Sequence, residues 1–282
     1  MSIFVNVTIQ PDQEHGRKLL VPTGIPTPHQ TPVSFKVEGG AVELSGEVST
    51  GQMAALISPE AGKAVTVSYA FADGGSGYPE PMFQPRLNRF TRAANELVDD
   101  VRGLVDSSKD GHAAIEAIVN AVAEKFHYGH PEVRFNDGLD EVPYISCGLT
   151  EGSCVDINTY LIACLRAAGL EAGYVYGYFF PEEKNGTCVD GHCWVVTRHE
   201  GVVLEWDIAH HLKLGTREIC CGLNPKPGHR VATAHSMGLS FSTLGIHETK
   251  LLGEPAWVSS DGKLASADLD IRCSIADEAV AA

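Results

Sequence analysis

The chain has 282 residues, of which 36 are acidic and 21 basic, so its formal net charge is −15. A chain of this length allows one large domain or two smaller ones, with a core that needs no disulfide support. An acidic surface repels phosphate backbones and anionic lipid headgroups, which argues against nucleic acid or a membrane surface as a partner. Peptides and neutral amides remain possible ligands, and the composition leaves the oligomeric state open.

The chain contains eight cysteines. Its first residues, MSIFVNVTIQ, have neither the basic nor the apolar segment of a secretion signal. No apolar stretch approaches the ~18 residues that a membrane-spanning helix needs. We therefore expect a cytoplasmic protein whose thiols stay reduced. Reduced thiols make cysteine chemistry a candidate function.

The first part of the chain has the alternating apolar and polar pattern of β-strands. The pattern is clear in FVNVTI and AVTVSYAFA, and VSFKVEGGAVELSGEV contains two such runs split at Gly39-Gly40, which predicts a hairpin. A stretch rich in glycine and proline from Asp73 to Pro85 then predicts a linker. We expect a β-rich N-terminal domain, 1–80, and a second domain, 86–282.

After the linker the apolar residues recur at helical spacing. This pattern predicts helices from Leu87 to Leu104, from Ile115 to Phe126, and from Cys154 to Ala168. A long polar loop, residues 127–150, separates the second helix from the third, and such loops in compact domains are often functional. The segments AGYVYGYFF, HCWVVTR and VVLEWDIA then predict three strands.

Cys154 occupies a position that suits a nucleophile. In GSCVDINTYLIACLRAAGL a pair of small residues precedes it and an amphipathic helix follows. At a helix N-terminus, unpaired backbone N–H groups and the positive end of the helix dipole favour thiolate over thiol. The same N–H groups can hold the oxyanion that forms during acyl transfer.

A cysteine nucleophile needs a base, and the base needs an orienting partner. His192 opens one strand of a predicted hairpin, and Asp207 closes the other. If the hairpin turns at His199-Glu200, His192 lies opposite Asp207. If it turns at Glu200-Gly201, Asp207 opposes Trp194, which shares the face of His192. Either turn brings imidazole and carboxylate to one face of one sheet.

Three motifs in this order resemble the transglutaminase-like superfamily: G-x-C-x-D opening a helix, H-x-W on a strand, and W-D ending the next strand. The resemblance extends over roughly residues 110–210. It implies an α+β fold with a papain/transglutaminase-like core, in which helices carrying the nucleophile pack on an antiparallel sheet carrying the base. It also implies a thiol-dependent acyl-transfer enzyme that acts on peptide or amide bonds without a cofactor or metal.

The resemblance assigns a role to each motif residue. Cys154 is the nucleophile that forms a thioester, and His192 is general base and then general acid. Asp207 orients His192 and stabilises the imidazolium, while Asp156 matches the motif aspartate and has a structural role. One departure is Cys193, which follows His192 where the family commonly has a small alanine.

Two substrate-binding residues are predicted. Trp206 is most simply a residue that packs on the sheet, but it can also line the acyl site, because aromatic residues often line apolar clefts. The family often carries an aromatic or amide oxyanion donor upstream of the cysteine. Tyr144 and Asn136 lie in the appropriate loop, and Tyr144 is the residue we name as substrate-binding.

Several alternatives remain open. Transfer to an amine instead of water makes the enzyme a protein-glutamine transglutaminase, and a transglutaminase-like fold can also serve as a non-catalytic binding module. Cys147 is either a surface thiol or a redox partner of Cys154. A zinc site is a weak alternative, because the spacing of the remaining cysteines and histidines matches zinc motifs only partly. The candidate zinc ligands are Cys188, His192, Cys193, His210, His211, Cys220 and Cys221.

Overall fold

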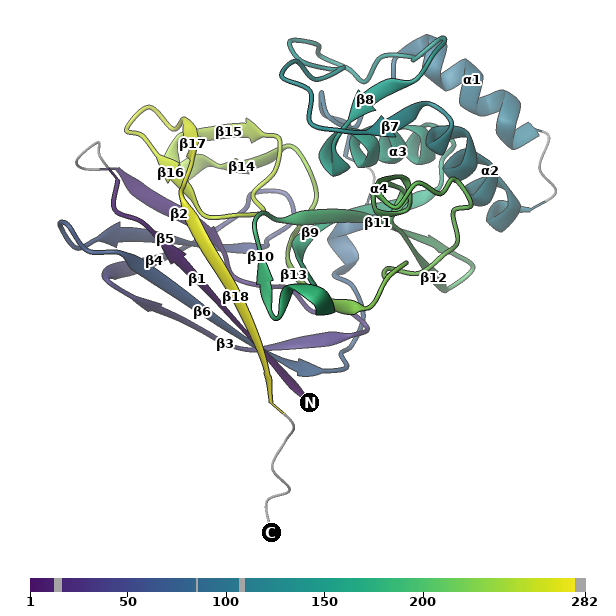
Figure 1. Ribbon diagram of the computed structural model, residues 1–282. Helices are drawn as coiled ribbons and strands as arrows, with labels where there is room; N and C mark the ends of the chain where they lie inside the picture. Colours follow the sequence, from purple (N-terminus) through teal and green to yellow (C-terminus); the bar gives the residue numbers. More distant parts are fainter. Residues whose placement is uncertain (13–16, 85, 107–109, 277–282) are drawn as a thin grey trace.

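The computed structural model of the protein describes residues 1–12, 17–84, 86–106 and 110–276. Parts of the two predicted domains and of the linker lie outside the described residues. They are residues 13–16, 85, 107–109 and 277–282. A β-rich part and a part with helices on a third large sheet lie side by side (Figure 1). Within the described ranges, no helix is both long and apolar enough to cross a membrane.

The β-rich part consists of two five-stranded sheets with the orders β10-β18-β1-β6-β3 and β17-β16-β2-β5-β4. Apolar residues from both sheets form one core, which includes Val5, Tyr69 and Trp257. The first sheet comprises β1 Ser2–Ile9, β3 Gln30–Glu38, β6 Val65–Asp73, β10 Thr187–Cys188 and β18 Leu269–Ala276. The second comprises β2 Lys18–Pro22, β4 Gly40–Gly46, β5 Met53–Pro59, β16 Ala256–Val258 and β17 Leu264–Ser266.

The predicted hairpin at Gly39-Gly40 is wrong, although both of its strands exist. β3 pairs with β6 in one sheet, and β4 pairs with β5 in the other. At Gly39 the chain passes between the sheets with φ +87°, and a Cβ there would lie 2.3 Å from the carbonyl oxygen of Ala64. Alternation predicts a strand, but it does not specify which partner the strand pairs with.

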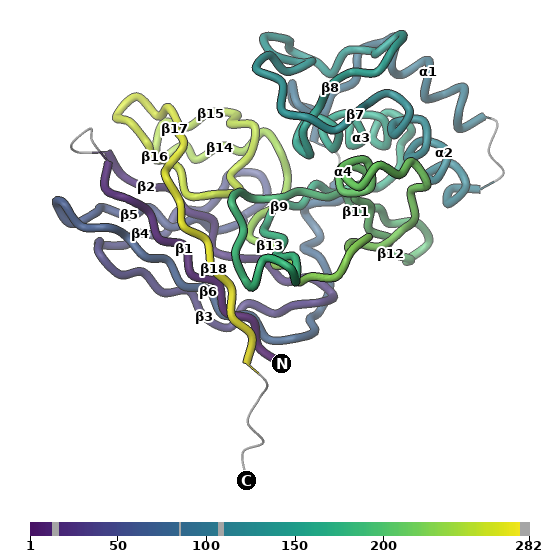
Figure 2. Tube along the Cα trace, viewed as in Figure 1, coloured from purple at the N-terminus to yellow at the C-terminus, as the bar shows by residue number. Residues whose placement is uncertain are grey.

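The C-terminal strands lie in the β-rich part, whereas the predicted division assigned them to the second domain. β18 is antiparallel to β1 along its whole length, from Ser2↔Ala276 to Ile9↔Leu269. Both views show the two strands side by side (Figure 1, Figure 2). The chain therefore leaves the first sheet, builds the helical part and returns, a long-range pairing that no local pattern encodes.

The helical part has a four-stranded antiparallel sheet with the order β12-β11-β9-β13. Its strands are β9 Glu171–Pro181, β11 His192–His199, β12 Val202–Trp206 and β13 Gly228–His235. The helices are α1 Asn95–Asp106, α2 Gly111–Ala123, α3 Cys154–Ala167 and α4 Ile208–Lys213. α3 packs on the sheet through a shared core with residues such as Leu161, Tyr174 and Val195. This arrangement confirms the predicted α+β fold class.

The remaining elements are short. They are β7 Phe126–Tyr128, β8 Thr150–Gly152, β14 Leu239–Phe241, β15 Ile246–Thr249 and the 3₁₀ helices η1 Glu80–Met82, η2 Glu182–Lys184 and η3 Ser242–Leu244. The predicted first helix begins at Asn95 instead of Leu87, whose side chain is exposed. The predicted loop is confirmed between β7 and β8, which pair in parallel with Tyr128 opposite Gly152.

Candidate active site

Cys154 is the first residue of α3 and is 7% exposed. The carboxylate of Asp156 accepts hydrogen bonds from the backbone N–H of Ser153 at 2.9 Å and from its hydroxyl at 2.7 Å. These two bonds fix Ser153, the residue that caps α3, and so hold the thiol of Cys154 at the helix N-terminus. The structural role expected of Asp156 is therefore this capping interaction.

The β11–β12 hairpin brings His192 and Asp207 together. Its register pairs Val195 with Trp206 and turns at Glu200-Gly201, where both residues have positive φ, as a two-residue hairpin turn requires. This is the second of the two predicted turns. Asp207 follows directly after β12, and its Oδ2 lies 2.7 Å from Nε2 of His192.

α3 is tied to β11 next to the histidine. Asn158, one turn after Cys154 on the helix, donates a hydrogen bond from Nδ2 to the carbonyl of Cys193 at 2.9 Å. The imidazole of His192 also hydrogen-bonds to the thiol of Cys154. Because its Nε2 faces Asp207, the ring nitrogen that remains for the thiol is Nδ1. The structure thus brings the three predicted triad residues together.

The charges of these three residues reinforce one another. A hydrogen bond from Cys193, together with the hydrogen bond and charge of His192, lowers the pKa of Cys154 well below its usual value despite burial. Burial lowers the pKa of His192, but Asp207 and Cys154 outweigh it and raise that pKa to about 9. His192 and Arg230 keep the pKa of the buried Asp207 well below its usual value. The favoured state is a thiolate beside an imidazolium.

Asp207 has further partners that the sequence did not predict. Its Oδ1 accepts the backbone N–H of His210 at 2.9 Å, which caps α4, and its Oδ2 also accepts a hydrogen bond from Arg230 of β13. His210 is 4% exposed and is therefore part of the buried surroundings of Asp207. Arg230 was missed because nothing in its local sequence predicts that β13 lies beside β9.

The structure argues against a metal ion at this site. In the described part of the chain, the one group of three candidate ligands is His192, Asp207 and His210. The guanidinium of Arg230 contacts Asp207 and lies 3.1 Å from Nδ1 of His210. A cation bound to these ligands would therefore face a fixed positive charge, which opposes its binding.

Cys193 lies beside the nucleophile, and Cys147 is exposed on the surface. Cys193 is fully buried, and its thiol hydrogen-bonds to that of Cys154 and accepts from Nδ2 of Asn158 at 3.4 Å. The departure noted in the sequence therefore places a second thiol in the site. Cys193 is therefore the thiol placed to react with Cys154, whereas Cys147 is exposed and Cys154 is buried.

The two predicted substrate-binding residues lie elsewhere. Trp206 is 1% exposed, and its indole N–H donates to the hydroxyl of Thr197 at 2.8 Å, so it is a core residue. Tyr144 lines a cavity with Ala94, Pro143 and others that includes none of the three triad residues. These placements give no support to the predicted roles of Trp206 and Tyr144.

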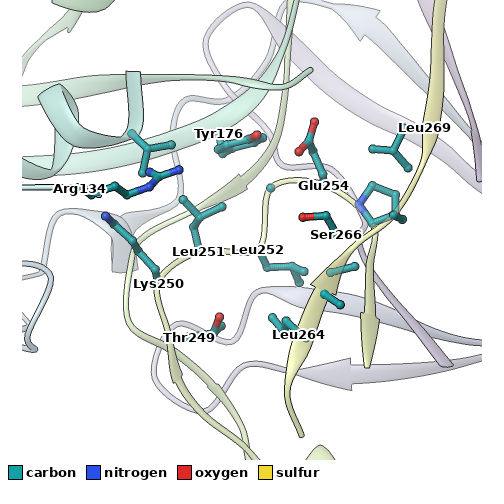
Figure 3. A pocket seen from close by; sticks show the side chains of 16 residues that line it. Arg134, Tyr176, Thr249, Lys250, Leu251, Leu252, Glu254, Leu264, Ser266 and Leu269 are labelled. Carbon is teal, nitrogen blue, oxygen red and sulfur yellow. The ribbon is translucent and has the colours of Figure 1, made fainter. Parts of the chain in front are cut away.

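Two other cavities adjoin the site. One, of about 410 Å³, is lined by His192 and Tyr128, and the other, of about 360 Å³, is lined by Val155 and Tyr176 (Figure 3). Burial, followed by the negative charges of Cys154 and its neighbours, raises the pKa of Tyr128, so its hydroxyl keeps its proton. Tyr128 ends β7, directly before the loop that was expected to carry an oxyanion donor. The signal that could have found it is its place at the end of a short strand before that loop.

The fold and the site define a class of papain-like α+β proteins with cysteine, histidine and aspartate at the junction of a helix and a sheet. Residues 98–202 match the Transglutaminase-like superfamily, a segment that includes Cys154 and His192. This part of the chain is therefore similar to the transglutaminase-like core. No curated protein matches the sequence.

One solved structure supports the same fold. A crystal structure named as a "Putative Cysteine Protease" from Cytophaga hutchinsonii is 13% identical, with a TM-score of 0.51, and the alignment covers 97% of this chain and 96% of that one. The periplasmic domain of TgpA from Pseudomonas aeruginosa is 16% identical, with a TM-score of 0.37, over 73% and 74% of the two chains. The first similarity extends the likeness of fold to the β-rich part.

Proposed function

We propose that this protein is a thiol hydrolase that cleaves peptide or amide bonds through a thioester on Cys154. The observation that carries the proposal is the contact of a buried helix N-terminal thiol with an imidazole whose Nε2 lies 2.7 Å from a buried carboxylate. This is the arrangement in which one group attacks, a second moves the proton and a third orients the second.

In the proposed reaction the Cys154 thiolate attacks the carbonyl carbon of the amide. The backbone N–H groups at the start of α3 and the hydroxyl of Tyr128 stabilise the oxyanion. The His192 imidazolium gives its proton to the leaving amine, and the thioester forms as the C–N bond breaks. Water then attacks the thioester with His192 as the base, which releases the acid and restores the thiolate.

The test is incubation of the wild-type protein and Cys154→Ala with a library of peptides, followed by mass spectrometry of peptides and protein. Hydrolysis by the wild type alone, with a transient mass increase on the peptide that carries Cys154, supports the proposal. A parallel reaction with an added primary amine separates the alternatives, because a transglutaminase gives the amine adduct in place of the acid. Binding of peptides with neither product indicates the non-catalytic module.

A further inference from the structure

The cavity beside Val155 is built by both parts of the molecule. Val155 of α3 and Tyr176 of β9 form one side, and the loop from Thr249 to Ala256 with strands β17 and β18 forms the other (Figure 3). Its volume of about 360 Å³ suits an amino-acid side chain with part of its backbone. Cys154, His192 and Asp207 do not line it, but Val155 directly follows Cys154 in α3, and from this we infer that a residue bound in the cavity lies near the reacting bond.

Two cationic side chains lie next to each other on one side of this cavity (Figure 3). Nη1 of Arg134 is 3.4 Å and Nζ of Lys250 is 4.0 Å from Oδ1 of Asp156. Because the other oxygen of Asp156 holds Ser153, a single carboxylate oxygen faces two cations. The nearby Asp137 is exposed to solvent, which screens its charge.

Lys250 is the more buried of the two cations. Its side chain is 20% exposed, against 38% for Arg134, and its Nζ donates to Oδ1 of Asn136 at 3.4 Å. Burial lowers the pKa of Lys250, with the negative charge of Asp156 acting in the opposite direction. An ammonium group held in such a place is incompletely compensated and gains from an additional anion.

Glu254 lies on the opposite side of the cavity from the two cations (Figure 3). Its carboxylate accepts the backbone N–H of Gly191 at 2.6 Å, which ties it to the loop before His192. Burial raises the pKa of Glu254, and the hydrogen bond from Gly191 acts in the opposite direction. Between the two sides, Leu251, Leu252 and Leu264 provide an apolar wall suited to methylene groups.

We propose that this cavity is a subsite for an acidic residue of the substrate, whose carboxylate binds to Lys250 and Arg134. The proposal rests on the proposed hydrolase function and adds its substrate class, a peptide with a carboxylate beside the bond that is cleaved. It is argued from two adjacent cations that share a single carboxylate oxygen of Asp156. The carboxylate can belong to a glutamate or aspartate side chain or to the end of the peptide.

The experiment uses pairs of quenched fluorescent peptides that differ only in glutamate versus glutamine at one position on either side of the cleaved bond. A further pair has a free or an amidated C-terminus, which distinguishes a terminal carboxylate from a side chain. We expect kcat/KM to be about tenfold higher for the acidic member of one pair, as for one charge-assisted contact. Equal rates within every pair overturn the proposal.

Three variants connect the preference to the cavity. Lys250→Gln should reduce the acidic preference to about twofold or less, and Arg134→Gln should reduce it by a smaller factor because Arg134 is more exposed. Lys63→Gln makes the same charge change at an exposed lysine outside the cavity lining and should leave the ratio unaltered. A preference that survives both cavity variants overturns the assignment.

The two proposals fail in different ways. If neutral and acidic peptides are cleaved equally in a Cys154-dependent reaction, the subsite is wrong and the hydrolase function stands. If no peptide of either kind is cleaved, although iodoacetamide modifies Cys154, the hydrolase function fails and the subsite proposal fails with it. Arg134→Gln keeps the test decisive if Lys250→Gln does not fold.

Discussion

Arg230 and Asp207 form an ion pair whose side chains are 5% and 0% exposed. The same guanidinium contacts the carbonyl of Leu223 and lies over the ring of Trp194, 5.1 Å from its centre. The carboxylate of Asp207 is thus shared between His192 and a buried arginine that comes from a different strand. Arg230 keeps Asp207 ionised and in position, which makes it a positioning residue for the site.

Replacement of Arg230 by glutamine should destabilise the fold strongly. Removing one partner leaves the buried charge of Asp207 uncompensated, which costs about 3 kcal/mol or more. Urea unfolding followed by tryptophan fluorescence measures the change. Arg272→Gln is the matched control, since Arg272 pairs with Asp270 on the surface and its loss should leave the midpoint nearly unchanged. Similar effects of the two substitutions would contradict the assignment.

The thiol of Cys154 should react with iodoacetamide at lower pH than a free cysteine peptide. Its pKa is lowered by Cys193 and by His192, so the thiolate persists as the pH falls below the usual thiol range. In His192→Ala the imidazolium is lost, and the reaction should require a higher pH. Peptide mapping across pH measures the rate at each cysteine.

Buried Cys164 serves as the internal reference for this labelling, because burial raises its pKa. It should stay unmodified at the pH where Cys154 reacts. A Cys154 profile that is the same in the wild type and in His192→Ala would show that the two side chains do not form an ion pair.

Activity should be lost at high pH through the deprotonation of His192. Its pKa is raised to about 9, so the imidazolium is present below that pH and disappears as the pH rises through it. Any stability that the charged His192 provides decreases in the same direction, between its ordinary pKa and about 9. The measurement is kcat/KM against pH with a cleaved peptide.

Asp207→Asn provides the comparison for this pH profile. It removes the carboxylate that raises the pKa of His192, so the upper limb should move to lower pH by about one unit or more. If the limb stays where it is in the wild type, a group other than His192 controls it.

Peroxide should link Cys154 to Cys193. The Cys154 thiolate attacks hydrogen peroxide to give a sulfenic acid and hydroxide, and the Cys193 thiol then displaces that hydroxyl as water to form the disulfide. The contact between the two sulfurs and the lowered pKa of Cys154 favour this reaction. Non-reducing peptide mapping detects the disulfide, and dithiothreitol should restore activity.

Cys193→Ala is the informative variant for this reaction. Without the second thiol, Cys154 should progress to sulfinic acid, and dithiothreitol should no longer restore activity. Cys147→Ala should behave as the wild type, because Cys147 is exposed whereas Cys154 is buried. A disulfide between Cys147 and Cys154 in the wild type would reverse this assignment.

Tyr128→Phe should lower kcat by about 100-fold with a smaller change in KM, if its hydroxyl donates to the oxyanion. The substitution keeps the ring, which lies 5.3 Å from Nζ of Lys213. Steady-state kinetics on one peptide measure both constants. Tyr144→Phe removes a hydroxyl from the loop that follows β7 and should leave kcat unchanged. Equal losses in the two variants would remove Tyr128 from the mechanism.

The features that could be predicted from the sequence are those set within a few neighbouring residues. The start of α3 at Cys154 follows from its cap and its helical spacing. One of the two predicted hairpin turns, Glu200-Gly201, is the observed one, and it brings His192 to Asp207. The side-chain directions of helices and strands repeat every few residues, so a local sequence is enough to indicate them.

The tertiary structure alone decided the contacts between distant parts of the chain. Arg230 reaches Asp207 because β13 pairs with β9, and Lys250 reaches Asp156 because the Thr249–Ala256 loop lies against α3. The pairing of β18 with β1 likewise joins the two ends of the described chain. Such contacts depend on how whole sheets and helices pack around a shared core. That packing is a property of the entire molecule, which no segment carries by itself.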